Sequence, residues 1–151
     1  KKDITITNPE MTRFMMNLDS AVDLVLHAFN KGKNGEIFIQ KSPAAKIKTI
    51  AQALIELYNS KSKIKYIGIR HGEKMYETLV TQEEMAKAED QGKYFKISPD
   101  DRDLNYDQYF STGVKKSTMD EYNSNNTNLL SVEEMKTLLI DLSVIKKDLD
   151  K

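Results

Sequence analysis

The chain has 151 residues, of which 39% are hydrophobic and 30% charged, which suits one compact domain and is too apolar for a disordered tail. Its 23 basic and 23 acidic residues balance, so no net field favours nucleic acid or an anionic membrane. The absence of cysteine excludes disulfides and thiolate metal sites, and no run reaches the roughly 20 apolar residues of a membrane span. We expect a cytoplasmic protein that neither crosses a membrane nor binds nucleic acid.

The first part of the chain predicts strands that alternate with helices. β-Branched residues predict a strand over 4–7, and a short extended piece follows over 12–16. Apolar residues at three- and four-residue steps predict amphipathic helices over 18–32 and 47–58, with a strand at 36–40 between them. The apolar face of the first helix consists of Leu18, Ala21, Val22, Val25, Leu26 and Phe29.

The middle of the chain is richer in strands. Apolar runs predict strands over 64–69, 76–80 and 93–98. A Thr-x-x-Glu capping box opens a short polar helix over 81–89. Strands that alternate with helices predict an α/β fold, and because the strands are short, we expect a small sheet with packed helices.

The last part changes in character. Over 99–128 Asp, Asn, Ser and Tyr dominate and apolar periodicity disappears, which predicts an irregular polar arm. Arms of this length usually bind, cover or cross to a neighbour. Ser131 and Glu134 form a capping box that opens a final helix. The predicted organisation is therefore a domain over 1–98, the arm, and a C-terminal helix within 129–151.

One charged cluster follows the strand at 64–69. Arg70 offers a planar fork of donors that matches two oxygens of a phosphate or carboxylate, and Glu73 can pair with it or accept hydrogen bonds from sugar hydroxyls. The alternative is a surface loop of solvated charges, which the spacing alone favours. His71 and Glu73 also have the H-x-E spacing of zinc deaminases, but the P-C-x-x-C that must follow is absent.

A second arginine lies in an apolar stretch, MTRFMM. Charged side chains avoid burial unless they are paired, so Arg13 either meets an anion or forms a salt bridge with a nearby acid, and the sequence leaves both open.

Several catalytic motifs are missing. There is no G-x-G-x-x-G turn, no tyrosine followed by lysine four residues later, no G-x-S-x-G and no Walker loop. The chain alone therefore carries no complete catalytic apparatus and no cofactor site that we can identify.

Four blocks, ITNPEMTRFMMNLDSAVDLVLHAF, GKNGEIFIQKSPAAKI, IGIRHGEKMYETL and DDRDLNYDQYF, resemble in this order the C-terminal part of CapD/CapE-type polysaccharide-biosynthesis proteins. These are UDP-N-acetylglucosamine 4,6-dehydratases and 5-epimerases, or UDP-glucose 4-epimerase-like proteins, of the extended short-chain dehydrogenase/reductase family. In that family an N-terminal Rossmann domain holds NAD(P) and the catalytic tyrosine and lysine. The resemblance implies that this chain is the substrate-binding portion, with the Rossmann domain and its NAD(P) absent.

The resemblance also implies roles for particular residues. Arg13 and Arg70 would bind the UDP phosphates, and Glu73 is a weaker candidate for substrate binding. The expected function is UDP-sugar binding in a nucleotide-sugar dehydratase or epimerase of capsule-type polysaccharide biosynthesis, a lyase or isomerase, with this portion inactive alone. Its expected partners are a UDP-sugar, the Rossmann domain and further copies in a homo-oligomer. We also expect an exposed apolar face where the Rossmann domain would pack.

A different class of function also fits the sequence. The chain could be a stand-alone interaction or assembly module whose arm, 99–128, docks on a partner.

Overall fold

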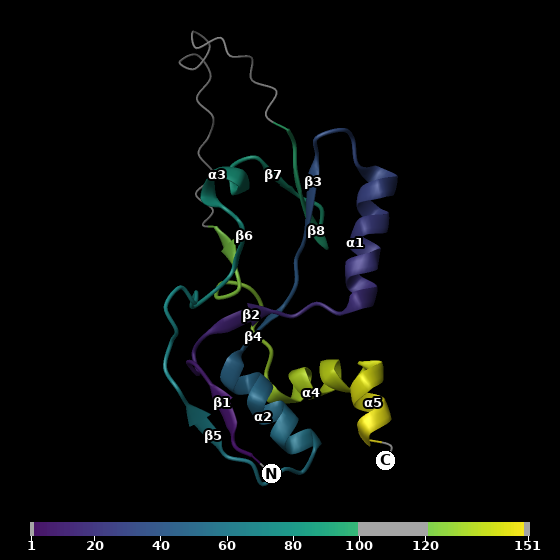
Figure 1. The fold of residues 1–151 in the computed structure, drawn as a ribbon. Helices are drawn as coiled ribbons and strands as arrows, with labels where there is room; N and C mark the ends of the chain where they lie inside the picture. The colour runs from purple at the N-terminus through teal and green to yellow at the C-terminus, as the bar shows by residue number, and fades with distance from the viewer. Residues whose placement is uncertain (1, 100–120, 150–151) are drawn as a thin grey trace. The chain divides into compact units, whose positions relative to one another are not determined.

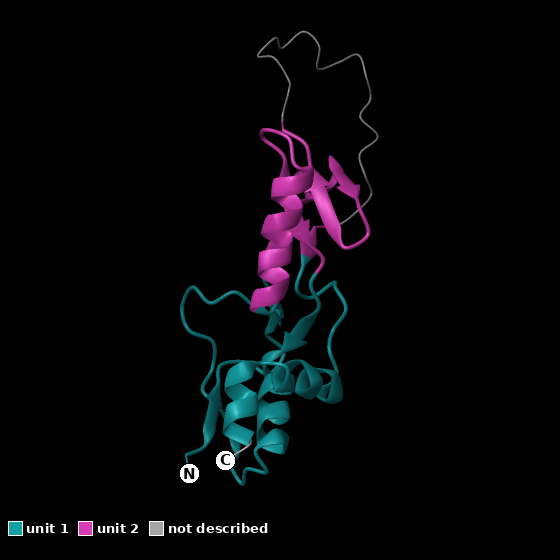
Figure 2. Ribbon diagram, turned by 90° about the vertical axis from the view of Figure 1, so that its right-hand side faces the viewer, with its two compact units in different colours: residues 1–17, 42–77, 123–151 teal, residues 18–41, 78–122 magenta. Residues whose placement is uncertain are grey.

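The computed structural model describes residues 2–99 and 121–149 (Figure 1). Backbone contacts divide the chain into two compact units (Figure 2). Unit 1 comprises 1–17, 42–77 and 123–151, and unit 2 comprises 18–41 and 78–122. Because the chain passes between the units repeatedly, each unit is assembled from segments that are distant in sequence.

The strands of unit 1 form two separate pairs. β1 (Ile4–Ile6) runs parallel to β5 (Ile64–Tyr66), and β2 (Thr12–Phe14) runs antiparallel to β4 (Ala44–Lys46). The strands predicted near residues 4, 12 and 64 are confirmed, although β5 is shorter than expected. β4 was not predicted because its two alanines have little strand propensity, and only the pairing with β2 makes it a strand.

The helices of unit 1 enclose its core. α2 (Ile47–Leu57) packs against α4 (Val132–Ile140), which is followed by α5 (Ser143–Leu149) (Figure 1). The predicted capping box at the start of α4 is confirmed, since the Ser131 hydroxyl accepts a hydrogen bond from the Glu134 N–H. The buried residues of this core are Ala45, Ala53, Met135 and Leu139.

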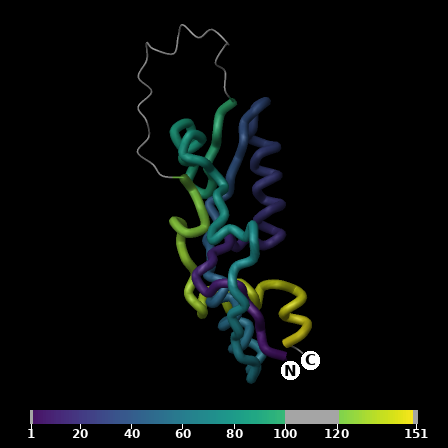
Figure 3. Tube along the Cα trace, turned by 60° about the vertical axis from the view of Figure 1, so that its left-hand side comes forward, coloured from purple at the N-terminus to yellow at the C-terminus, as the bar shows by residue number. Residues whose placement is uncertain are grey.

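Unit 2 combines one long helix with a three-stranded antiparallel sheet. α1 (Leu18–Lys31) contacts β3 (Ile37–Gln40), and the two run alongside each other in Figures 1 and 3. The sheet has the order β3-β8-β7, where β8 is Tyr94–Ile97 and β7 is Ala88–Asp90. The buried residues of the second core are Val80, Met85, Phe95 and Ile97.

Two short strands and a single turn of helix complete the described chain. β6 (Thr78–Val80) pairs with β9 (Tyr122–Asn123), and α3 (Gln82–Met85) begins with the predicted Thr81–Glu84 capping box. The helix expected over 81–89 was too long, because residues 88–90 instead pair with β8 as β7.

The fold class is confirmed as small α/β, but the expected single sheet is wrong. The strands of the described residues fall into four separate sheets of two or three strands. Most of the predicted arm, 99–128, lies outside the described residues, so the division into 1–98, 99–128 and 129–151 stays a prediction. Within the part that the structure describes, no helix has the length and apolar character needed to cross a membrane.

Candidate functional site

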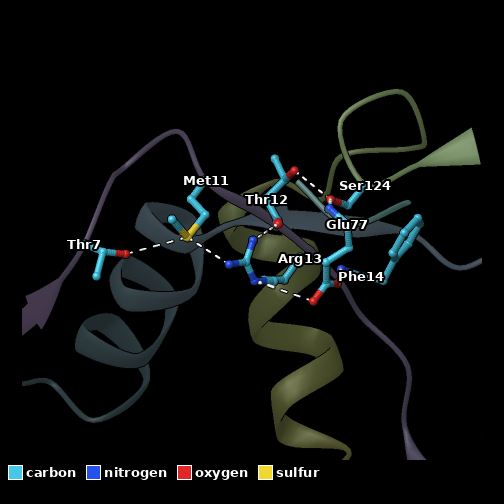
Figure 4. A network of polar contacts seen from close by, with 7 residues as sticks. All are labelled: Thr7, Met11, Thr12, Arg13, Phe14, Glu77 and Ser124. Atoms are coloured by element: carbon cyan, nitrogen blue, oxygen red, sulfur yellow. Dashed lines mark hydrogen bonds and ion pairs between the residues drawn. The ribbon is translucent and has the colours of Figure 1, made fainter. Parts of the chain in front are cut away.

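Arg13 lies in the middle of β2 and is held by neighbours in unit 1 (Figure 4). Its Nη1 donates a hydrogen bond to the Thr12 carbonyl oxygen at 2.7 Å, and its Nη2 contacts the Met11 sulfur at 3.0 Å. Its Nε lies 3.6 Å from the Glu77 carboxylate. The described contacts thus include the salt bridge that the sequence left open, formed by side chains that are both partly accessible to solvent.

Glu77 and Ser124 connect the Arg13 strand to two other segments. The Glu77 carboxylate accepts a hydrogen bond from the Phe14 N–H at 3.3 Å. The Glu77 N–H donates to the Ser124 hydroxyl at 2.9 Å, and the Ser124 N–H donates back to the Glu77 carbonyl at 2.8 Å. The Ser124 hydroxyl also lies 2.8 Å from the Thr12 hydroxyl, and both of these side chains are buried (Figure 4). We call Thr12, Glu77 and Ser124 the polar hub.

The polar hub was not predicted from the sequence. Glu77 stands in a strand-like run and Ser124 in a polar run, and neither local pattern signals a contact across 47 positions. The hub bonds the residues on both sides of Arg13, and its Glu77 carboxylate also faces the guanidinium.

Arg70 lies on an exposed turn after β5. Its backbone N–H donates to the Glu73 carboxylate at 2.9 Å, and the Glu73 N–H donates to the Arg70 carbonyl at 3.1 Å. Gly72, between them, has φ +83°, a conformation that glycine adopts without strain. Across residues 2–99 and 121–149, no ion pair or hydrogen bond engages the Arg70 guanidinium. Glu73 therefore shapes the turn through the backbone and leaves the guanidinium available.

Both arginines belong to unit 1. The short segment 71–77 leads from Arg70 to Glu77, which forms the ion pair with Arg13. Beyond the Arg70 turn, the Met75 carbonyl accepts a hydrogen bond from the Thr12 N–H at 2.9 Å. Two residues later, Glu77 faces Arg13. The Arg70 turn is thus tied at its C-terminal end to the strand that carries Arg13.

His27 and Glu134 make contacts that belong to the fold itself. His27 in unit 2 stacks on Tyr94 with ring centroids 4.2 Å apart, at the edge of the core as expected. No group of three or more potential metal ligands occurs among the residues whose positions are described. At the α4 N-terminus, hydrogen bonds from the Ser131 N–H and hydroxyl lower the pKa of Glu134 below its ordinary value.

Comparison with known proteins extends over nearly the whole chain. Residues 1–99 match the family described as polysaccharide biosynthesis protein, and residues 100–146 match the one described as polysaccharide biosynthesis protein C-terminal. UDP-glucose 4-epimerases of Rickettsia bellii and Rickettsia prowazekii are 55% and 54% identical to it over 149 residues. The match covers 98% of this chain and 44% of each relative, so the chain spans less than half of their length.

A solved structure supports the same grouping. Pen from Bacillus thuringiensis has a TM-score of 0.73 and 34% sequence identity, over 93% of this chain and 41% of that one. The resemblance drawn from the four sequence blocks is therefore confirmed. By sequence and by fold, this chain belongs to the polysaccharide biosynthesis protein family and corresponds to its C-terminal part.

Proposed function

We propose that this chain binds the diphosphate of a UDP-sugar through Arg13 and Arg70, as the substrate-binding part of a nucleotide-sugar epimerase or dehydratase of polysaccharide biosynthesis. The observation that carries the proposal is the Arg70 turn, where Glu73 fixes the backbone and the guanidinium is exposed. The name UDP-glucose 4-epimerase on the Rickettsia relatives supports a uridine diphosphate sugar as the ligand class.

The two arginines would contribute differently. A diphosphate presents several charged oxygens, and an arginine binds them with charge-assisted, often bidentate hydrogen bonds. Arg70 can bind the diphosphate without first breaking another contact, since its guanidinium has no partner among the described residues. Arg13 would either share its remaining N–H groups or loosen its contact with Glu77, and an ion pair whose two side chains are both partly accessible to solvent is weaker than a buried one.

The chemical step would need groups from outside this chain. In the proposed enzyme NAD(P), bound by an N-terminal Rossmann domain, would supply hydride transfer at the sugar. Arg13 and Arg70 would fix the UDP half, so that binding energy from this unreactive half orients the hexose. We therefore expect the 151-residue chain to be inactive alone and to bind UDP-sugars weakly, because it supplies only part of the contacts.

The test is calorimetric titration of the chain with UDP, using uridine as the ligand that lacks phosphates. Since a hydrogen bond to a charged group contributes about 1.5–3 kcal/mol, Arg70→Ala should weaken UDP binding by roughly 10- to 100-fold. Lys74→Ala removes one positive charge four residues after Arg70 in the same chain. It is the matched control, and we expect it to change UDP binding little. Equal losses in both variants, or equal affinity for UDP and uridine, would refute a specific phosphate contact at Arg70.

The alternative, a stand-alone assembly module acting through 99–128, stays a prediction. Most of that segment lies outside the described residues, and no described contact favours it over substrate binding.

A further inference from the structure

Glu77 is anchored at its backbone and at one end of its side chain (Figure 4). Its N–H donates to the Ser124 hydroxyl, and its carbonyl oxygen accepts from the Ser124 N–H. One carboxylate oxygen, Oε2, accepts a hydrogen bond from the Phe14 N–H at 3.3 Å. Because these contacts hold the residue from both sides, the second carboxylate oxygen, Oε1, has a defined position beside Arg13.

The contact with Glu77 engages Arg13 at Nε and leaves donors at the far end of the guanidinium. A guanidinium has five N–H groups, one on Nε and two on each terminal nitrogen. Oε1 of Glu77 lies 3.6 Å from Nε. Nη1 donates to the Thr12 carbonyl oxygen and Nη2 contacts the Met11 sulfur. One N–H on each terminal nitrogen therefore has no partner among the described residues.

The two arginines differ in how far they are ordered without a ligand. Arg13 is contacted by its sequence neighbours Met11 and Thr12 and, from a distant segment of the chain, by Glu77. The Arg70 guanidinium has no partner among residues 2–99 and 121–149. Ordering a long side chain during binding lowers the affinity, so a side chain that is already held loses less.

Glu77 could instead compete with a phosphate for Arg13. A carboxylate that imitated the ligand would bind two guanidinium nitrogens at once, as a bidentate pair does. The ion pair instead joins Oε1 to Nε, while Oε2 is engaged by the Phe14 N–H. Both side chains of the pair are partly accessible to solvent, where water and salt weaken the repulsion between a carboxylate and a diphosphate. The contacts therefore favour an orienting role over competition.

We propose that Glu77 is a positioning residue for Arg13. Its anchored carboxylate holds the guanidinium at Nε, so that one N–H on each terminal nitrogen stays available to the phosphate oxygens of a UDP-sugar. The inference rests on the proposed function and deepens it, because Arg13 would bind with its remaining N–H groups and keep its contact with Glu77. Arg13 is then ordered before the ligand binds, whereas Arg70 becomes ordered on binding.

The first measurement uses the 151-residue chain without ligand, so it does not depend on the proposed function. The heteronuclear NOE of an arginine Nε–H group reports how rigidly that group is held on the ps–ns timescale. We expect a higher NOE for Arg13 than for Arg70 in the wild type, and a fall towards the Arg70 value in Glu77→Gln. Equal values for the two arginines in the wild type, or no change in Glu77→Gln, would overturn the proposal.

The variant and its control remove the same charge. Glu77→Gln keeps an oxygen that can accept from the Phe14 N–H, so it tests the charge and not the backbone contacts. The control is Glu10→Gln, which removes a carboxylate from an ion pair with Lys46 of β4, the strand paired with β2. We expect the control to leave both the Arg13 NOE and UDP binding unchanged. Because the comparison of the two arginines is made in the wild type, it tests the proposal even where Glu77→Gln does not fold.

The second measurement is calorimetric titration with UDP. Glu77→Gln should weaken binding by roughly two- to tenfold, the cost of ordering one long side chain on binding. In an Arg13→Ala background the same substitution should have no further effect, because the side chain that Glu77 positions is gone. An equal loss in both backgrounds would mean that Glu77 acts through the fold alone, and tighter binding in Glu77→Gln would make it a competitor. Either result would overturn the proposal.

Failure of this proposal differs from failure of the proposed function. Equal affinity of the wild type for UDP and uridine would refute the phosphate contact itself, and the role of Glu77 with it. UDP binding that depends on Arg13 and Arg70 but not on Glu77 would leave the proposed function standing and refute only the positioning role.

Discussion

Two helices with similar sequence patterns have opposite environments in this protein. α2 has an apolar face at three- and four-residue steps, and it packs that face against α4 in the core of unit 1. α1 has an equally regular apolar face, yet none of its residues is buried. The comparison teaches that periodicity determines which side of a helix is apolar, whereas burial depends on a partner being present. The predictions below test that difference, from the largest expected effect to the smallest.

Met135 is the largest fully buried side chain in the α2–α4 core, with only 2% of its surface exposed. Met135→Ala leaves a cavity that its neighbours fill only in part, so the free energy of unfolding should fall by about 2–5 kcal/mol. Urea denaturation followed by circular dichroism measures this change. A loss below about 1 kcal/mol would mean that the α2–α4 contact is loose and that the contrast with α1 is smaller than the structure implies.

Ser124 tests whether the polar hub stabilises unit 1. Ser124→Ala removes the hydroxyl that accepts from the Glu77 N–H and contacts the Thr12 hydroxyl, leaving buried groups unpaired. The expected loss in unfolding free energy is about 1–3 kcal/mol. In a double-mutant cycle with Thr12→Val, the two losses should not add, because both variants remove the same contact. Strict additivity would show that the two hydroxyls do not interact.

The capping box of α4 predicts a pH dependence. Hydrogen bonds from the Ser131 N–H and hydroxyl lower the pKa of Glu134 in the folded protein below its ordinary value of 4.5. The stabilisation is therefore fully present above the unfolded pKa and is lost as the pH falls through the lower, folded pKa. Glu134→Gln should have a lower melting temperature than the wild type near neutral pH, and the difference should shrink in acid. A constant difference down to about pH 3 would contradict this linkage.

Phe29 should give the smallest effect on stability. Because 85% of its surface is exposed, Phe29→Ala should change the free energy of unfolding of the 151-residue chain by no more than about 0.5 kcal/mol. The same urea experiment as for Met135→Ala measures it. A loss above about 2 kcal/mol would show that Phe29 is buried within this chain, and the apolar face of α1 would then be a core face.

Local patterns in the sequence predicted most of the elements. The helices α1, α2 and α4, both capping boxes, and strands β1, β2, β3 and β8 were predicted because their signals, periodicity and caps, lie within a few residues. β4 and β7 were missed because their short segments become strands only by pairing with β2 and β8. The single sheet was wrong for the same reason, since strand partners are chosen by long-range packing.

The candidate site, like the fold, could be predicted from the sequence only in part. By itself the sequence determined the residue types that suit a diphosphate, the charged cluster that contains Arg70 and Glu73, and the family, since four ordered blocks of residues carry that resemblance. Only the tertiary structure decided that Glu77 faces Arg13, that Ser124 closes the polar hub, and that the apolar face of α1 is exposed. The physical reason is that these hydrogen bonds and this burial depend on contacts between segments that are far apart in sequence. No local pattern of residues encodes such contacts.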